Sequence, residues 1–384
     1  KQYHNVKTQL FRKNVSEIII ATDAGREGEL VARWILDKSG CHKPIRRLWI
    51  SSVTDKAIKE GFAHLKDGRA YNDLYHAARS RAEADWLVGI NATRALTCKY
   101  NAQLSCGRVQ TPTLAMIAHR EQQIRSFKPE DYYGLRCTTS VTGGSVGTMA
   151  SIVTWTWQQK KSGSLRSFNK ELITGLDKKL KNQTLTVTDV HTSSKRTPSP
   201  GLYDLTELQR DANKRFGFSA KETLNIMQSL YEHHKVLTYP RTDSRYIGTD
   251  IVPTIKERLK ACNIGPYKKY IPELLKKPLR TSKAFVDDKK VSDHHAIIPT
   301  EEYVQMEHMS NNERKIYDLV VRRFISVLYP AFEYEQTTLK AEAAGETFTA
   351  KGKVIKAAGW KAVYADAASS GSSASQYDAY GDYE

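Results

Sequence analysis

The sequence predicts a multidomain protein of the mixed α/β (α+β) class, and three observations lead to this prediction. The chain has 384 residues, which is more than a single domain usually holds. Hydrophobic residues make up 40% of it and charged residues 26%, which is the usage of a folded protein and excludes a mostly disordered one. Segments with helical periodicity also alternate along the chain with segments rich in β-branched residues.

The charge of the chain favours a polyanionic partner. It contains 59 Lys and Arg against 42 Asp and Glu, which gives a formal net charge of +17 at pH 7. Neutralisation of phosphates by basic side chains drives nucleic-acid binding, so we favour a nucleic acid over the alternative of a merely basic protein. The 5 cysteines form no C-x2-C pair, which argues against a zinc module. No run of ~20 apolar residues predicts a helix across a membrane.

The N-terminal part of the sequence predicts a strand, then an acidic loop, then a helix. Residues 17–22 are a short β-branched run of the kind found in buried parallel strands. The apolar residues that follow at helical spacing are Leu30, Val31, Trp34 and Ile35. Between the two lie Asp23, Glu27 and Glu29, at a strand end of the kind that often holds ligands in α/β proteins.

These carboxylates could bind a cation. Hard oxygen ligands of this kind bind Mg²⁺, usually with phosphate oxygens completing the coordination shell. The alternative is a solvated acidic turn, because carboxylates also stabilise the N-terminus of a helix. The spacing alone leaves the two interpretations equally open.

The rest of the chain predicts alternating helical and β-rich segments. Residues 71–123 have a helical pattern, and residues 132–190 read as antiparallel strands with loops. Helices return after residue 201 with three predicted capping boxes, namely Thr206 with Gln209, Ser219 with Glu222, and Ser310 with Glu313. The apolar stripes that follow Ser219 and Ser310 are predicted to be core, and the first of them consists of Leu224, Met227, Leu230 and Tyr231. Residues 331–364 return to a β pattern, and the Ala/Ser/Gly-rich residues 367–375 are predicted to be disordered.

The segment Tyr239-Pro240-Arg241 is a candidate for nucleophilic chemistry. A tyrosine hydroxyl has an unperturbed pKa of about 10, and a nearby arginine favours its phenolate while holding a phosphate. Residues 239 and 241 point to the same side of an extended segment, which suits attack on a phosphodiester and a covalent phosphotyrosine. The alternative is an ordinary tyrosine in a proline-containing turn, and by itself this alternative is favoured.

Two further segments carry candidate phosphate ligands. Residues 105–113 combine small residues with Arg108 and Gln110, and their alternative is a helix-breaking loop. Residues 292–300 contain His294, which could bind or protonate a phosphate, or be an ordinary hydrogen-bonded loop histidine. The sequence contains neither a P-loop nor a G-x-G-x-x-G after a strand, which argues against ATP hydrolysis and a dinucleotide cofactor.

Taken together and in this order, the four segments resemble a known family. Residues 22–29 resemble the metal-binding motif of a Toprim domain. Residues 104–111, 238–246 and 294–300 resemble three further motifs of type IA DNA topoisomerases. The proline after Tyr239 and the amino-acid sequence of residues 202–224 resemble those of the bacterial topoisomerase III subfamily.

The resemblance implies the toroidal core of a type IA topoisomerase, divided into successive segments. The expected segments are a partial Toprim domain (1–60), the first half of a helical gate domain (61–127), a β-rich arch (128–200), a helical domain with the nucleophile (201–330), a return to the arch (331–364) and a disordered tail (365–384).

The implied activity is ATP-independent cleavage of one DNA strand through a 5′-phosphotyrosyl intermediate, followed by strand passage and religation. Such an enzyme relaxes negative supercoils and decatenates DNA. The resemblance makes Tyr239 the nucleophile, Arg241 its phosphate-holding partner and His294 a contact of the scissile region. Asp23 and Glu27 would hold Mg²⁺. Single-stranded DNA would be held by Arg26, Arg94, Ser105, Gly107, Arg108, Val109 and Gln110. The expected setting is the bacterial cytoplasm and nucleoid, away from membranes, with a helicase as a further partner.

Three departures from the family pattern qualify this expectation. Gly25 stands where the family has a second Asp, and Glu29 is open as its replacement. The first Toprim strand, with its catalytic Glu and nearby Lys, has no match before residue 17. The second half of the gate domain has none after residue 364. The chain is therefore expected to be a piece cut at both ends, and the alternative function is a catalytically impaired fragment that binds single-stranded DNA. A Toprim nuclease is a weaker alternative, because activated water needs no tyrosine.

Overall fold

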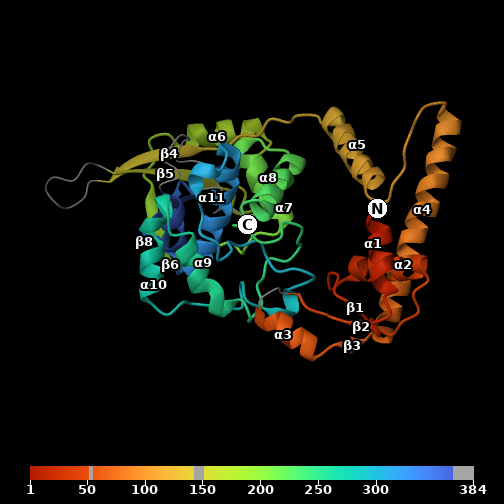
Figure 1. The fold of residues 1–384 in the computed structure, drawn as a ribbon. Coiled ribbons are helices and arrows are strands. Elements are labelled where there is room, and N and C mark those ends of the chain that lie inside the picture. The colour runs from red at the N-terminus through yellow and green to blue at the C-terminus, as the bar shows by residue number, and fades with distance from the viewer. Residues whose placement is uncertain (52–54, 142–150, 366–384) are drawn as a thin grey trace. The chain divides into compact units, whose positions relative to one another are not determined.

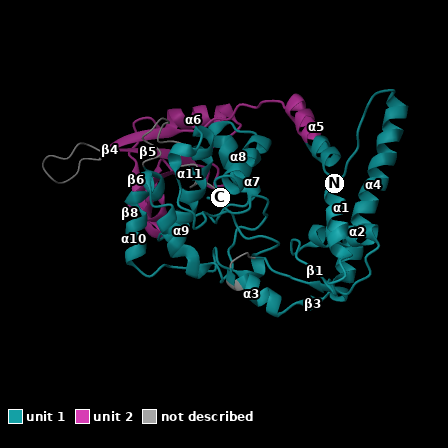
Figure 2. Ribbon diagram, viewed as in Figure 1, with its two compact units in different colours: residues 1–116, 199–330, 363–384 teal, residues 117–198, 331–362 magenta. Residues whose placement is uncertain are grey.

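The computed structural model describes residues 1–51, 55–141 and 151–365 and divides the chain into two compact units (Figures 1 and 2). Unit 1 contains residues 1–116, 199–330 and 363–384, and unit 2 contains residues 117–198 and 331–362. Helices and sheets are mixed along the chain, so the predicted α/β class is confirmed. The predicted disordered tail falls almost entirely on residues 366–384, which lie outside the described residues.

The N-terminal part of unit 1 is a small three-stranded sheet with helices. Its elements in chain order are α1 (Gln2–Leu10), β1 (Ile18–Ile20), α2 (Arg26–Ser39), β2 (Ile45–Arg47), α3 (Asp55–Ala63) and β3 (Lys66–Asp67). The strand order is β1-β2-β3, with β1 and β2 parallel and β3 antiparallel to β2. The predicted strand, acidic loop and helix are therefore confirmed. A buried cluster holds them together, formed by Leu10, Ile20, Ala32, Leu36 and Cys41.

Two long helices follow, α4 (Asn72–Tyr100) and α5 (Gln110–Ser126). The predicted helical stretch is confirmed, with a break at residues 101–109 that begins where Asn101 takes a left-handed conformation (φ 47°). α4 packs on α2. Both helices expose large apolar side chains, among them Trp86, Leu87, Val88, Leu114 and Met116. None of the helices in the described part of the chain combines the length and apolar character needed to cross a lipid bilayer.

The second part of unit 1 is helical and contains many fully buried side chains. Its α-helices are α7 (Leu205–Phe216), α8 (Ala220–Glu232), α9 (Ile255–Ala261), α10 (Ile271–Lys276) and α11 (Asn311–Leu328). On α8, Met227 and Leu230 are fully buried, as the apolar stripe predicts. Tyr231 belongs to the same predicted stripe but is 37% exposed, so the core assignment is wrong there. α11 buries every residue from Leu319 to Leu328, which is typical of a central helix.

The N-terminal caps of α7, α8 and α11 can be compared with the three predicted capping boxes. Ser310 and Glu313 form the complete reciprocal box at α11, and Ser219 accepts a hydrogen bond from the backbone N–H of Glu222 at α8. The prediction of a cap at Thr206 is wrong. α7 starts two residues earlier, because the Asp204 carboxylate accepts the backbone N–H of Glu207 at 2.7 Å.

Unit 2 is built on one antiparallel sheet of five strands in the order β4-β5-β8-β7-β6. Its elements are β4 (Arg136–Val141), β5 (Ser151–Gln158), α6 (Lys170–Leu180), β6 (Thr186–Thr197), β7 (Phe332–Ala343) and β8 (Glu346–Ala357). The predicted β-rich pattern is confirmed, but the sequence pattern did not predict α6. Asn169 caps that helix, and its apolar side packs on the sheet through Ile173, Leu176, Trp155 and Trp157.

The Glu313 carboxylate links α11 to α8 and generates a pH-dependent prediction. Burial by itself raises the pKa of Glu313, but hydrogen bonds from Ser229 and Ser310 and the neighbouring His234 outweigh it and lower the pKa from 4.5 to about 2. Ser229 Oγ donates to Glu313 Oε1 at 2.6 Å, and the Ser310 backbone N–H donates to Oε2 at 2.7 Å. A carboxylate with a lowered pKa stabilises the fold above its unfolded pKa and loses this contribution as the pH falls through the folded value.

We expect Glu313→Gln to lower the free energy of unfolding at pH 7 by about 1–2 kcal/mol, because a cap and a charge-assisted hydrogen bond are weakened. The difference from the parent should shrink as the pH falls from about 4.5 towards 2. Urea unfolding at several pH values measures it. The matched control is Glu257→Gln, which removes an exposed carboxylate paired with Lys260. A difference that is constant over this pH range would contradict the assignment.

Candidate active site

The acidic loop turns tightly between β1 and α2. A Cβ at position 28 would lie 2.9 Å from the backbone N and C of Asp23 and closer still to its carbonyl oxygen, so only glycine fits there. The Thr22 hydroxyl closes the turn by donating to the Gly28 carbonyl at 2.8 Å. The Asp23 side chain is left 61% exposed at the strand end.

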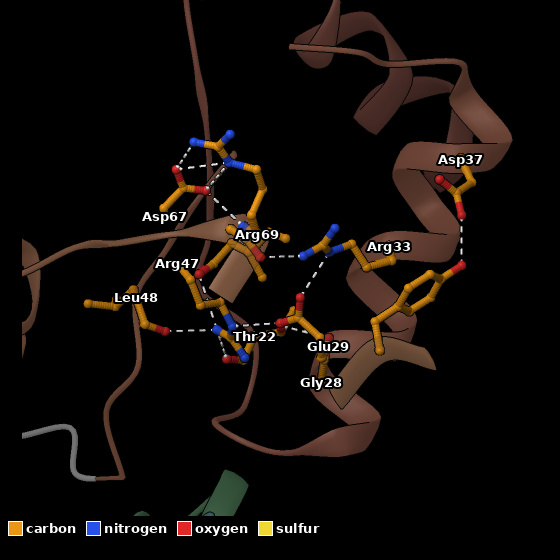
Figure 3. Close-up of polar contacts among 12 residues, drawn as sticks. Thr22, Gly28, Glu29, Arg33, Asp37, Arg47, Leu48, Asp67 and Arg69 are labelled. Carbon is orange, nitrogen blue, oxygen red and sulfur yellow. Dashed lines mark hydrogen bonds and ion pairs between the residues drawn. The ribbon is translucent and has the colours of Figure 1, made fainter. Parts of the chain in front are cut away.

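A buried arginine holds this loop in place (Figure 3). Arg47 is fully buried at the end of β2, and its Nε donates to Glu29 at 2.9 Å. Its other nitrogens donate to backbone carbonyls at the end of β1 and around it, namely those of Ile20, Thr22, Asp23 and Leu48. Arg33 donates to the second oxygen of Glu29 at 2.9 Å. Glu29 is thus fully buried and paired with two arginines, and this arrangement excludes it as the replacement for the missing carboxylate at position 25.

The tyrosine and histidine motifs lie side by side in the fold. The backbone N–H of Thr238 donates to the Ile298 carbonyl at 3.0 Å, and the Thr242 hydroxyl donates to the His294 carbonyl at 3.0 Å. An antiparallel bridge joins Leu237 to Pro299. The two segments are far apart in the sequence, so this backbone pairing brings their side chains together.

Three of the predicted site residues, Tyr239, His294 and Asp23, lie close together. The rings of Tyr239 and His294 are 4.3 Å apart, with their planes inclined at 39°. His294 Nε2 lies 3.5 Å from Asp23 Oδ2, which connects the histidine motif to the acidic loop. The ring of Tyr231, from the predicted core stripe of α8, packs edge-on against Tyr239 at 5.5 Å. Tyr239 is therefore held between two rings beside a carboxylate.

The surroundings of Tyr239 raise the pKa of its phenol above 10. Burial is the largest cause, the charge of Asp23 adds to it, and Arg241 acts in the opposite direction. The predicted influence of Arg241 thus has the expected sign but is outweighed. The phenol is protonated at neutral pH, so a reaction at this oxygen requires its proton to leave as the new bond forms.

The two predicted metal ligands have different surroundings. Asp23 faces His294, whereas Glu27, in the first turn of α2, pairs with Arg81 at 2.9 Å. Among the described residues, no group of three or more His, Cys, Asp or Glu side chains is arranged to hold a metal ion. Asp293, which the sequence analysis did not single out, lies against Gly25. Its only signal in the sequence is its place directly before His294.

The predicted DNA-binding motif forms the loop between α4 and α5. The loop is fastened to α4, since the Cys106 backbone N–H donates to Thr93 at 2.9 Å and Arg108 pairs with Asp85 at 3.3 Å. Gln110 donates to Ser105 at 3.2 Å, and Val109 is 67% exposed. Arg94 is exposed on α4. In the part of the chain that the structure describes, no hydrogen bond or ion pair joins residues 104–111 to Tyr239 or His294.

Comparison with known proteins agrees with this set of motifs. A family model described as DNA topoisomerase matches residues 69–379. Proteins named DNA topoisomerase 3 from Bacillus cereus and Bacillus subtilis are 62% and 59% identical over 364 residues, which is 95% of this chain. The chain spans only 48% and 49% of these two relatives. Full-length topoisomerase I from Thermotoga maritima has a similar fold, with a TM-score of 0.64 and 23% identity over 94% of this chain and 57% of that one.

The chain therefore belongs to the DNA topoisomerase family. The predicted resemblance to a type IA enzyme of the bacterial topoisomerase III subfamily is confirmed by the two Bacillus relatives and by the shared fold.

The Arg47 network generates a stability prediction. We expect Arg47→Lys to cost about 2–3 kcal/mol in free energy of unfolding, because an ammonium keeps the charge but cannot reach Glu29 and the four carbonyls together. Arg69→Lys is the matched control, since Arg69 pairs with Asp67 but its side chain is 85% exposed. That change should leave the free energy of unfolding nearly unchanged, because an exposed ion pair contributes little. Equal losses in the two variants, measured by urea unfolding, would contradict the role given to Arg47.

Proposed function

We propose that the protein to which this chain belongs is an ATP-independent topoisomerase of the type IA, topoisomerase III kind. It cleaves one DNA strand through a 5′-phosphotyrosyl intermediate, passes a strand and religates the break, which relaxes negative supercoils and separates catenated DNA. The contact of the Tyr239 and His294 rings at 4.3 Å, with Asp23 next to the histidine, is the observation that carries this proposal.

In the proposed reaction, Tyr239 Oη attacks a phosphodiester phosphorus. The new O–P bond forms as the bond from phosphorus to the 3′ oxygen breaks, so the 5′ phosphate stays on the tyrosine. The phenolic proton passes to His294 and from the imidazolium to the departing 3′ oxygen, which becomes a hydroxyl. Arg241 holds the phosphate oxygens with its planar guanidinium. Religation reverses each step, with the 3′ hydroxyl as the attacking group.

The family implies Mg²⁺, and the donors of the acidic loop suit it. Mg²⁺ is commonly bound through one or two carboxylates, with waters and substrate phosphates completing its shell, so a cluster of three protein ligands is not required. Asp23 and Glu27 are the proposed ligands, and their side chains are 61% and 65% exposed. The ion would supply positive charge beside the scissile phosphate. The chain's own contribution is to keep Asp23 at the strand end through Arg47.

Single-stranded DNA is the proposed substrate, in negatively supercoiled or catenated molecules. The proposed contacts are Arg26, Arg94, Ser105, Gly107, Arg108, Val109 and Gln110. The division into partial Toprim (1–60), gate (61–127), arch (128–200 and 331–364) and tyrosine-bearing (201–330) segments is part of the same proposal. So are a helicase partner and action in the bacterial cytoplasm at the nucleoid.

The alternative is that this chain by itself is a catalytically impaired fragment that still binds single-stranded DNA. Gly25 in place of a carboxylate favours this alternative, because Glu29 is paired with Arg33 and Arg47 and cannot replace it.

A covalent adduct separates the two functions. We expect the chain, incubated with Mg²⁺ and 3′-end-labelled single-stranded DNA and then denatured with detergent, to carry the label on a gel. Tyr239→Phe should abolish the labelled band, because it removes the attacking oxygen. Tyr246→Phe is the matched control in the same segment and should keep the band. Absence of a band in the parent chain, with DNA binding intact in a gel shift, would support the impaired fragment.

Salt dependence tests the proposed DNA contacts. Affinity for a single-stranded oligonucleotide should fall steeply between 50 and about 200 mM salt, since each neutralised phosphate releases counterions. Arg108→Ala should weaken binding and reduce the slope of log affinity against log salt by about 1. Arg69→Ala removes an arginine outside the proposed contacts and should leave the slope unchanged. Fluorescence anisotropy measures both, and an affinity that does not change with salt would contradict the electrostatic argument.

A further inference from the structure

The backbone at Gly25 does not require a glycine. Gly25 is the N-cap residue of α2, with φ −163° and ψ 178°, an extended conformation that any residue adopts. Aspartate is among the preferred residues at such a position, because its carboxylate can accept the free N–H groups of the first helical turn. No side chain makes this cap in α2.

The side chain of Asp293 fills the place beside Gly25. A Cβ at position 25 would lie 2.5 Å from both Cγ and Oδ1 of Asp293, and closer still to Oδ2. Real Cβ atoms essentially never approach another heavy atom below 3.0 Å. The Asp293 carboxylate therefore occupies the place where a side chain on residue 25 would begin. A side chain at position 25 would have to push the end of the Asp293 side chain aside, so positions 25 and 293 compete for this place.

Asp293 lies beside the acidic loop in the fold. Its sequence neighbour His294 places Nε2 3.5 Å from Asp23 Oδ2, and the Gly25 backbone N–H donates to the Asp23 carbonyl at 2.9 Å. Asp243 has another partner, because it accepts a hydrogen bond from the Ser292 hydroxyl at 2.5 Å. Glu29 is paired with Arg33 and Arg47, so it does not compete for this role.

We propose that Asp293 is a ligand of the divalent cation, acting with Asp23 and supplying the carboxylate that the acidic loop lacks at position 25. The inference rests on the cation site of the proposed function and assigns it a residue from the histidine motif. Two carboxylates with waters and phosphate oxygens form a sufficient donor set for Mg²⁺. The neighbour of Asp293 in sequence, His294, contacts both Tyr239 and Asp23, so the cation would lie beside the nucleophile.

Direct ion binding tests the proposal without any cleavage assay. We would titrate the full chain with Mn²⁺, a probe for the Mg²⁺ site, and count free ions by electron paramagnetic resonance. Asp293→Asn should weaken Mn²⁺ binding about tenfold or more, as expected when a metal site loses an essential carboxylate. Asp243→Asn is the matched control, because it removes an equal charge from the same surroundings, and it should change the affinity by no more than about twofold.

Moving the carboxylate from position 293 to position 25 tests whether the two positions can supply the same ligand. Gly25→Asp alone must push the end of the Asp293 side chain aside, because a Cβ at position 25 would lie within 2.5 Å of its carboxylate. The double variant Gly25→Asp/Asp293→Gly moves the carboxylate to the loop and should keep an Mn²⁺ affinity within about twofold of the parent. This variant also keeps the test valid if a single variant loses stability.

The outcomes separate this inference from the proposed function. Mn²⁺ binding that is unchanged in Asp293→Asn, or reduced equally by Asp243→Asn, would overturn the role of Asp293 and leave the proposed function standing. A parent chain that binds no Mn²⁺ would overturn the cation site and this inference with it. The Tyr239 adduct would then decide separately whether the nucleophile works.

Discussion

The buried guanidinium of Arg47 is the interaction on which the N-terminal half of the site depends. A charge removed from water is stable only with an opposite charge and a full set of hydrogen-bond partners, and Arg47 has Glu29 and four carbonyls around the end of β1. One of those carbonyls belongs to Asp23, so the arginine fixes the backbone of the acidic loop. Because the backbone is fixed, the Asp23 carboxylate can point outward to His294.

The other half of the site depends on backbone pairing between two distant segments. Hydrogen bonds between residues 236–242 and 294–300 set Tyr239 and His294 at ring contact. The surrounding helices provide the rigid support, since Met227, Leu230 and most of α11 are fully buried. The catalytic chemistry that we propose needs a nucleophile, a proton acceptor and a carboxylate within a few ångströms, and these two fixed segments provide all three.

Much of the site was predictable because its chemistry is local. The capping box at Ser310, the strand before Asp23 and the tyrosine motif each depend on residues within a few positions of one another. The failures have physical reasons too. Thr206 resembles a cap by spacing, yet Asp204 reaches the free N–H groups first. α6 is short, and its helical face becomes visible only against Trp155 and Trp157. Tyr231 follows the apolar stripe but packs on Tyr239 instead of the core.

Motifs and periodicity are properties of short segments, so they were sufficient to predict the class of fold, the family resemblance and the residue types of the site. Which carboxylates are available depends instead on how distant segments pack. Glu29 is enclosed by two arginines, whereas Asp293 lies against Gly25 from a segment far along the chain. The direction of the Tyr239 pKa was decided in the same way, because burial and the charge of Asp23 outweigh the neighbouring Arg241. Burial and long-range contacts depend on how distant segments pack, which no local pattern records.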